Sequence, residues 1–239
     1  MAVKPLSSTL KVLQVLDVIA SAPTPLRLTQ IARALGEARG AVHQRLVTLA
    51  TAGWVEQTGD GAYRLTLRIV AQGAMAMEQA SLGERLATAL EDLVATSGET
   101  SSIAVLDGAE AVIVRRVESG GMLRADLRVG TRLPLDRTAF GRVLVAHAPA
   151  GTVSRLRAAG VPLPAPEVIE RVRAEGIAIS EGPGPRALSA VAAPIFDLAG
   201  NCLCALAASG PYAGFDAARC AAAVRTVASR INARLQGAP

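Results

Sequence analysis

Two short helical patterns, separated by a single turn, constrain the fold of this chain more than any other feature. Thr29 can cap a helix over Gln30–Leu35, and Gly36 suits the left-handed turn that would end it. The second pattern runs over residues 39–52 and places three apolar side chains on one face: Val42, Leu46 and Leu49. Paired helices at this spacing predict a helix-turn-helix.

The flanking segments extend this motif to a small domain. Residues 7–20 show helical periodicity, and Pro23 and Pro25 end that helix. After the second motif helix, two short strands are expected at Trp54–Gln57 and Ala62–Leu65, joined by a turn that contains Asp60-Gly61. Three helices followed by a hairpin is the order of a winged helix-turn-helix domain.

The net charge of +5 is concentrated in this domain. Residues 1–68 contain eight lysines or arginines and four acidic residues, whereas residues 69–239 contain seventeen and sixteen. A small basic domain is typical of proteins that bind the phosphate backbone of nucleic acids.

The next segment, residues 67–77, is apolar around almost the whole circumference of a predicted helix. An exposed helix of this kind needs a covering surface, either from the chain's own domains or from the same helix of a second subunit, and we favour the second subunit. The chain of 239 residues is also longer than one typical domain of roughly 100–150 residues. We therefore divide it into a DNA-binding domain (1–66), a linker and dimerisation helix (67–83) and a C-terminal domain (84–239).

The C-terminal part mixes helices and strands in an α+β pattern. After a helix that ends at Ser97-Gly98, a strand hairpin turns at Asp107-Gly108. Later helices are expected over residues 138–147, 166–175 and 215–235, and strands over 176–180, 187–196 and 202–209.

Several protein classes are disfavoured by the sequence. No stretch approaches the roughly 20 uninterrupted apolar residues of a membrane span, so a cytoplasmic protein without membrane contact is expected. Cys202, Cys204 and Cys220 have no CxxC spacing and only two histidines to join them, which predicts buried, reduced thiols without a metal or other cofactor. The GxSxG, P-loop and HExxH motifs are absent, so we expect no enzyme.

Two sets of motifs resemble the IclR family of bacterial regulators. The first is LTQIARALGEARGAVHQRLVTLATAGWVEQTGDGAYRLTLRI; the second is AVLDGAEAVIVRRVESGG, VGTRLPLDRTAFGRVLVA, VRAEGIAIS and AVAAPIFDLAGNCLCALAASGP, in the family's order. The resemblance implies an α+β chain with an N-terminal winged helix-turn-helix domain, a linker helix and a C-terminal GAF-like α/β effector-binding domain. It also implies a homo-oligomer, dimer or tetramer, on palindromic operators. SEGPGPRAL departs from the family pattern, which usually has an acidic pair and a glycine there.

In a helix-turn-helix, the amino-terminal side chains of the second helix reach base edges in the major groove. Arg39, His43 and Gln44 are the base-reading candidates, since arginine pairs with guanine and glutamine with adenine. Gly40 permits either a close approach to DNA or close packing against the preceding helix. The predicted backbone contacts are Arg27, Thr29, Gln30 and Arg45, with Thr58 and Arg64 from the hairpin. For Arg45 the alternative is an ion pair within the domain.

The resemblance places an effector pocket between the sheet and the helix that begins at TAFG. Backbone N–H groups of Ala139 and Phe140 would suit a carboxylate there, and Arg142 is a further candidate partner for it. The candidate effector contacts are Met122, Leu133, Ala139, Phe140, Gly141, Arg142, Ser180, Ser189, Ala190 and Ser209. Alanines at positions 190 and 207, where the family usually has polar residues, favour a larger acid, such as an aromatic one.

These features together predict a transcription regulator whose binding to double-stranded operator DNA is modulated by a small organic acid. The alternative is a small-molecule sensor or scaffold that acts through protein contacts without binding DNA.

Overall fold

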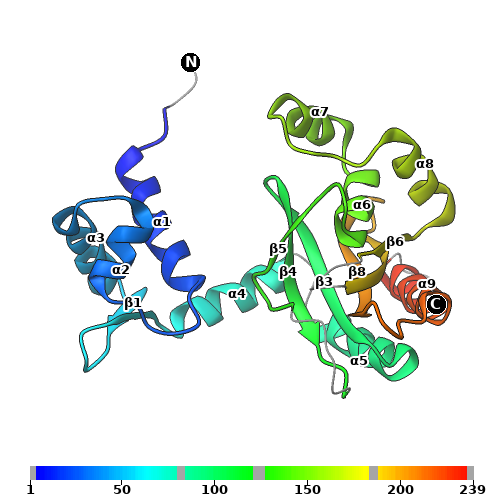
Figure 1. Cartoon of the computed structure of the whole chain (residues 1–239), viewed down its shortest axis with the longest axis horizontal. Coiled ribbons are helices and arrows are strands. Elements are labelled where there is room, and N and C mark those ends of the chain that lie inside the picture. The colour runs from blue at the N-terminus through cyan, green and yellow to red at the C-terminus, as the bar shows by residue number, and fades with distance from the viewer. Residues whose placement is uncertain (1–3, 80–83, 121–126, 183–187, 236–239) are drawn as a thin grey trace. The chain divides into compact units, whose positions relative to one another are not determined.

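The computed structural model describes residues 4–79, 84–120, 127–182 and 188–235. They belong to two compact units, Met1–Ser81 (unit 1) and Leu82–Pro239 (unit 2), each with its own fold (Figure 1). None of the helices in the described ranges is long and apolar enough to cross a membrane.

Unit 1 begins with three helices, α1 (Ser7–Ala20), α2 (Leu28–Leu35) and α3 (Arg39–Thr51). A hairpin of β1 (Val55–Gln57) and β2 (Tyr63–Leu65) follows, and α4 (Arg68–Gln79) completes the unit. Gly36 ends α2 with a φ of 64°, in the left-handed region that glycine adopts without strain. This turn lets α3 start three residues later.

The core of unit 1 lies between the three helices and the hairpin. Hydrogen bonds of 2.8 and 3.0 Å between the backbones of Leu26 and Tyr63 attach the segment before α2 to the hairpin. The buried members of the core are Val15, Ile19, Ile31, Ala32, Val42, Leu46, Leu49, Val55 and Tyr63. One face of α3 is thus committed to packing.

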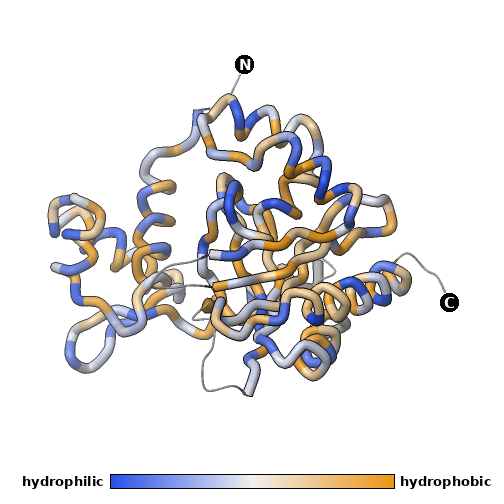
Figure 2. The backbone as a smooth tube through the Cα atoms, turned by 45° about the vertical axis from the view of Figure 1, so that its right-hand side comes forward, coloured by the Kyte–Doolittle hydropathy of each residue, from blue (hydrophilic) through white to orange (hydrophobic). Residues whose placement is uncertain are grey.

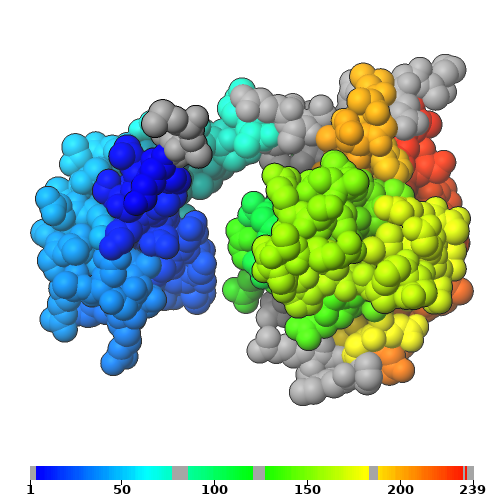
Figure 3. All heavy atoms as spheres, turned by 90° about the horizontal axis from the view of Figure 1, so that it is seen from above, coloured from blue at the N-terminus to red at the C-terminus, as the bar shows by residue number. Residues whose placement is uncertain are grey.

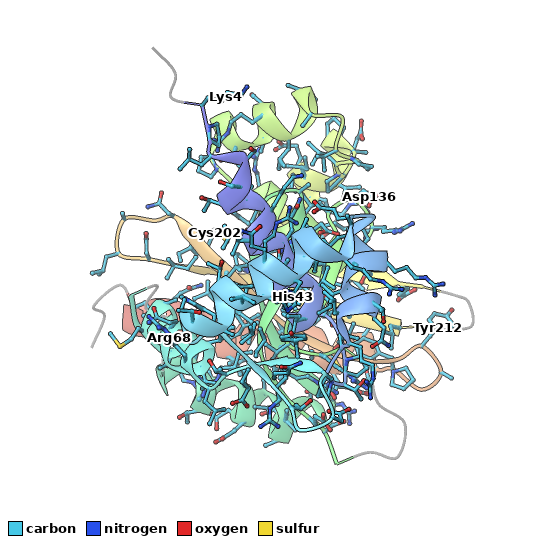
Figure 4. The ribbon with its side chains drawn as sticks, turned by 90° about the vertical axis from the view of Figure 1, so that its left-hand side faces the viewer. Lys4, His43, Arg68, Asp136, Cys202 and Tyr212 are labelled. Carbon is cyan, nitrogen blue, oxygen red and sulfur yellow. The ribbon has the colours of Figure 1, made fainter. Side chains whose placement is uncertain are left out.

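The first turn of α4 is fixed to the rest of unit 1 by Arg68 (Figure 4). Its Nη1 donates to the carbonyl oxygen of Ala52 at 2.6 Å, and its guanidinium carbon lies 5.1 Å from the ring centroid of Trp54, within cation–π range. Around this helix, the apolar side chains of Leu67, Val70 and Met75 are exposed.

Unit 2 is built on an antiparallel sheet in the strand order β5-β4-β3-β8-β7-β6. Its strands are β3 (Thr100–Asp107), β4 (Glu110–Val117), β5 (Arg132–Pro134), β6 (Ala178–Glu181), β7 (Leu188–Phe196) and β8 (Cys202–Pro211). Its helices are α5 (Glu84–Ser97), α6 (Ala139–Ala146), α7 (Ala150–Ala158), α8 (Pro166–Glu175) and α9 (Ala217–Leu235).

The helices cover both faces of this sheet. α5 and α9 contact one face, and α6 with α8 covers the other, which we call the α6 face (Figure 1). In Figure 3 the segment from α6 to α8, in yellow-green to yellow, lies nearest the viewer. A core cluster on the α6 face joins Phe140, Leu156 and Ile169, from three different helices, to strand residues such as Ala192 and Ala207. Figure 2 shows the hydrophobic residues running along the central strands, as expected for a sheet buried on both faces.

Most elements expected from the sequence occur within two residues of their expected bounds. The predicted cap of the second helix was wrong, because α2 already begins at Leu28 and Thr29 lies inside it. The N-cap residue is Arg27, whose N–H group donates to the Gln30 side chain at 2.7 Å. Neither α7 nor β5 was expected. The three-part division at residues 66 and 83 stays a prediction, since α4 falls within unit 1.

Candidate DNA-binding and effector sites

The α3 helix has two different faces. Val42, Leu46 and Leu49 are buried, whereas the predicted base-reading residues Arg39, His43 and Gln44 are exposed. Figure 4 looks onto this helix and labels His43. Gly40 shares the exposed face, and a β-carbon added there would meet no atom within 4 Å. Among the described residues, no packing contact requires a glycine at position 40, and a close approach of DNA there stays a prediction.

The amino-terminal half of α2 lies beside this face. Thr29 and Gln30 are exposed, and they line a surface hollow of about 670 Å³ together with Arg33 and Arg39. The hollow therefore combines residues predicted to contact the backbone with one predicted to read bases. Sequence reasoning missed Arg33, which lies one turn after Gln30 on the exposed side of α2.

Arg45 makes an ion pair inside the domain, as the alternative interpretation had it. Its Nη1 lies 2.5 Å from Oε2 of Glu37, and Lys11 Nζ lies 3.4 Å from Oε1 of the same carboxylate. The Arg45 hydrogen bond, helped by Lys11, lowers the pKa of Glu37 below its usual value. Arg45 is only 16% exposed, so it is less available to a phosphate than Arg39.

The candidate arginines in the hairpin and at the start of α2 are paired with acidic side chains on the surface. Arg64 Nε lies 2.6 Å from Glu56, and Arg27 lies 3.5 Å from Asp60. The Thr58 hydroxyl is within hydrogen-bonding distance of the Asp60 carboxylate and of the Ala62 carbonyl oxygen. Exposed pairs of this kind are weak, so the two arginines can exchange these carboxylates for phosphates.

The candidate effector site starts at the amino terminus of α6. Thr138 caps this helix: its hydroxyl accepts a hydrogen bond from the Gly141 N–H group at 3.1 Å and donates one to the Pro134 carbonyl oxygen at 2.7 Å. The cap occupies the third N–H group, and those of Ala139 and Phe140 have no hydrogen-bond partner among the described residues. Free N–H groups at a helix start favour an anion.

Gly141 has a packing role that the sequence did not reveal. A β-carbon at this position would lie 2.4 Å from Cα of Leu135 and 2.5 Å from its carbonyl oxygen. The strand-to-helix connection therefore passes directly over the first turn of α6.

Three of the predicted effector contacts, Ser180, Ala190 and Ser209, form one row across the sheet. Ser180 pairs with Ala190, and Ala190 pairs with Ser209, so their side chains point to the same face. Ala190 packs against the core cluster of the α6 face, which identifies that face. Ser189 is the neighbour of Ala190 in β7 and faces the opposite side, towards α5 and α9, so the structure does not bring it to the others.

Arg142 is already engaged by backbone groups. Its Nη1 donates to the Ile179 carbonyl oxygen at 2.7 Å, and its Nε to the Asp136 carbonyl oxygen at 3.4 Å. The arginine thus ties the first turn of α6 to β6. Leu133 packs against the same core cluster as Phe140, and Met122 lies outside the described residues.

Sequence reasoning missed three buried hydroxyl groups next to this row: Thr100, Ser102 and Ser119. Thr100 pairs with Ser209, and Ser102 pairs with Ala207, so both face α6. The run Thr100-Ser101-Ser102 in a strand whose other residues are mostly apolar was the available signal.

Cys204 and Cys220 are buried as expected, whereas Cys202 is only partly buried. All three are free, and burial raises the pKa of Cys202 to about 12 and that of Cys220 to about 11. Over the described ranges, no group of three or more His, Cys, Asp or Glu side chains could hold a metal ion.

Comparisons with known proteins connect both units to one family. The IclR helix-turn-helix domain matches residues 8–59, and the C-terminal domain of the bacterial transcriptional regulator IclR matches residues 74–233. The HTH-type transcriptional regulator BhcR of Paracoccus denitrificans is 31% identical over 224 residues, which make up 89% of this chain and 80% of BhcR.

Solved structures share the fold. An IclR transcriptional regulator from Alicyclobacillus acidocaldarius superimposes with a TM-score of 0.77 at 24% identity, covering 98% of this chain and 100% of that one. An IclR homolog complexed with 4-hydroxybenzoate from Microbacterium hydrocarbonoxydans gives 0.77 at 22% identity, covering 96% and 99%.

These matches confirm the expected α+β fold class, and the matched domains and relatives are transcriptional regulators rather than enzymes. The two domains of the family together match most of the residues of this chain, so the chain belongs to the IclR family of bacterial transcriptional regulators.

Proposed function

We propose that this regulator reads double-stranded operator DNA with α3, and that a small carboxylic acid bound in unit 2 changes its affinity for that DNA. The observation that carries the DNA-binding part is the division of α3, which buries Val42, Leu46 and Leu49 and exposes Arg39, His43 and Gln44. A recognition helix needs one face held by its domain and the other free for the groove.

In this proposal, base reading and backbone binding come from different residues. Arg39 and Gln44 have the side-chain types that pair bidentately with guanine and adenine. Thr29, Gln30 and Arg33 line the same hollow as Arg39, and they would contact phosphates on the rim of the groove. Thr58 and Arg64 would add contacts from the wing and Arg27 from the start of α2, whereas Arg45 acts mainly through Glu37.

We further propose that two copies pair through α4. Leu67, Val70 and Met75 are 83%, 64% and 58% exposed, and a helix with this much uncovered apolar surface is stabilised by a partner. Pairing would also present two α3 helices to two half-sites, as palindromic operators require. A tetramer would be formed by two such dimers.

For the effector, the amino terminus of α6 and the row Ser180, Ala190 and Ser209 support a carboxylic acid. The N–H groups of Ala139 and Phe140 suit the carboxylate, and Leu133 with Phe140 supplies apolar surface for the rest of the molecule. The structural neighbour complexed with 4-hydroxybenzoate is consistent with an aromatic acid. In this arrangement Arg142 positions α6 rather than contacting the ligand.

The DNA-binding proposal is tested by fluorescence anisotropy on the DNA upstream of the protein's own gene and of the adjacent gene, at several salt concentrations. We expect saturable binding. The logarithm of the association constant should fall linearly with the logarithm of the salt concentration, with a slope of about −0.9 for each phosphate contact. A protein that acts as a sensor or scaffold through protein contacts would bind none of these fragments, and that result would contradict the proposal.

The effector proposal is tested by repeating the measurement with carboxylic acids present. If acid and DNA are coupled, an acid that shifts operator affinity must bind the DNA complex with an affinity changed by the same factor. We expect the coupling to act through the relative placement of the two DNA-binding domains, with α4 as the moving element.

A further inference from the structure

The hydroxyl group of Ser102 is fully buried and has no hydrogen-bond partner in the described part of the chain. Its neighbours do have partners. Thr100 Oγ1 accepts a hydrogen bond from the Ser119 N–H group at 3.2 Å and lies 3.4 Å from Ser119 Oγ, and Ser209 Oγ donates to the Thr100 carbonyl oxygen at 3.4 Å. Ser102 is therefore the unsatisfied member of a group of four buried hydroxyls.

The register of the sheet places this hydroxyl on the α6 face. Ser102 pairs with Ala207, which belongs to the core cluster of α6. Towards β8 the neighbours of Ser102 on this face are small, since Ala192 pairs with Ala207, whereas towards β4 Ser102 pairs with Arg116. None of these neighbouring side chains hydrogen-bonds the Ser102 hydroxyl.

The α6 helix packs on this same face of the sheet. The carboxyl-terminal end of α6 and the residues after it, Leu144 and Ala148, line a hollow with Leu106 and Gly108 near the tip of the β3–β4 hairpin. The start of the helix is tied to two strands of the sheet, because Thr138 bonds to Pro134 of β5 and Arg142 bonds to Ile179 of β6, beside Ser180. The unsatisfied hydroxyl and the free N–H groups of α6 thus lie on one face of the sheet.

We propose that Ser102 is a specificity-determining residue of the effector site, and that its hydroxyl hydrogen-bonds an oxygen on the effector other than the carboxylate. This inference rests on the proposed carboxylic-acid effector and names its class more closely: a hydroxy or oxo acid. An acid that places a C–H group against Ser102 leaves the hydroxyl unsatisfied, whereas an acid with an oxygen there supplies the missing hydrogen bond.

Ser101 provides a matched control. It is adjacent in sequence and equally buried, and its hydroxyl also has no partner in the described ranges. It pairs with Ala208 and faces the other side of the sheet, towards α5 and α9. The two serines differ mainly in which face they occupy.

The test uses two pairs of acids that differ by one hydroxyl: benzoate with 4-hydroxybenzoate, and propionate with lactate. Calorimetric titration measures their affinities for the full-length wild-type protein, Ser102→Ala and Ser101→Ala. We expect the wild type to prefer the hydroxy acid of at least one pair by about tenfold. The preference should fall to about one in Ser102→Ala and remain in Ser101→Ala.

Thermal unfolding without ligand gives a second, independent measurement. Removing an unsatisfied buried hydroxyl should leave the Tm of both variants equal to or above that of the wild type. A fall of more than about 2 °C for Ser102→Ala alone would mean that the hydroxyl has a structural hydrogen bond, and would overturn the inference.

The outcomes separate the two proposals. Suppose that an acid binds, but Ser102→Ala keeps the wild-type preference or the wild type does not prefer the hydroxy acid of either pair. The proposed role of Ser102 is then wrong, while the acid effector stands. If none of the four acids binds the wild type, the effector class itself is wrong, and the role of Ser102 falls with it.

Discussion

The guanidinium of Arg45 in α3 contacts the carboxylate of Glu37, in the turn that precedes this helix, at 2.5 Å. Lys11 of α1 contacts the second oxygen of the same carboxylate at 3.4 Å. Glu37 therefore connects α1, the turn and α3, and it holds the exposed face of α3 in place without touching that face.

We expect Glu37→Gln to lower the Tm of the protein at neutral pH, because two cations lose their anionic partner. The pKa of Glu37 is lowered by the Arg45 hydrogen bond, so its contribution is complete above the ordinary value of 4.5 and is lost as the pH falls through the folded-state value. The Tm difference between variant and wild type should shrink in that acidic range. Glu56→Gln, which breaks the exposed pair with Arg64, is the control and should change the Tm little.

Arg39→Ala should weaken specific operator binding by about 1–3 kcal/mol if this arginine reads a guanine. The side chain is exposed and lies outside the core, so the Tm should not change. Anisotropy on operator and on unrelated DNA measures the specific part, and Arg157→Ala, an exposed arginine of α7 in unit 2, is the control. An unchanged operator affinity would reject Arg39 as a base-reading residue.

Two glycines predicted as site residues should respond oppositely to alanine. Gly141→Ala should destabilise unit 2 strongly, because the new β-carbon would lie 2.4 Å from backbone atoms of Leu135. Gly40→Ala meets no atom and should keep or raise the Tm by its helix propensity. If DNA approaches α3 closely, Gly40→Ala should still weaken operator binding. Wild-type affinity in a fully folded Gly40→Ala would show that no close approach occurs there.

Elements with a regular apolar period were predictable from the sequence, and elements without one were not. The buried face of α3 could be read directly from Val42, Leu46 and Leu49. In contrast, α7 buries only Leu156, so its sequence carries no helical period, and the three residues of β5 form a strand only by pairing with β4.

The candidate sites divide in the same way. Exposure of Arg39 and Gln44 follows from their places on one helix. The neighbours of Ser102 include Ala207, which is about a hundred residues away in the chain and adjacent only through the sheet register. The partners of Arg45 and Arg142 likewise come from other elements, so sequence reasoning found these arginines but not what they contact.

Val70→Glu should convert the protein from dimer to monomer, because it places a charge in the apolar surface of α4 that we propose to be the dimer contact. Sedimentation velocity over a range of concentrations measures the change. Gln72→Glu adds the same charge two residues later, on a different side of the helix, and should leave the dimer intact. A Val70→Glu protein that remains dimeric would exclude α4 as the contact, and a monomeric wild type would contradict the pairing altogether.

The Thr138 hydroxyl accepts a hydrogen bond from the Gly141 N–H group and donates one to the Pro134 carbonyl oxygen, so it both caps α6 and ties the helix to the end of β5. Thr138→Ala should lower the free energy of unfolding of unit 2 by about 1–2 kcal/mol, and Thr138→Ser, which restores both hydrogen bonds, should recover most of this loss. Urea unfolding followed by circular dichroism measures the difference.

The same pair of variants tests the carboxylate site. If the acid binds at the N–H groups of Ala139 and Phe140, its stabilising effect should weaken in Thr138→Ala and return in Thr138→Ser, because the cap fixes the direction of those groups. Equal stabilisation by the acid in both variants would place the carboxylate elsewhere in unit 2.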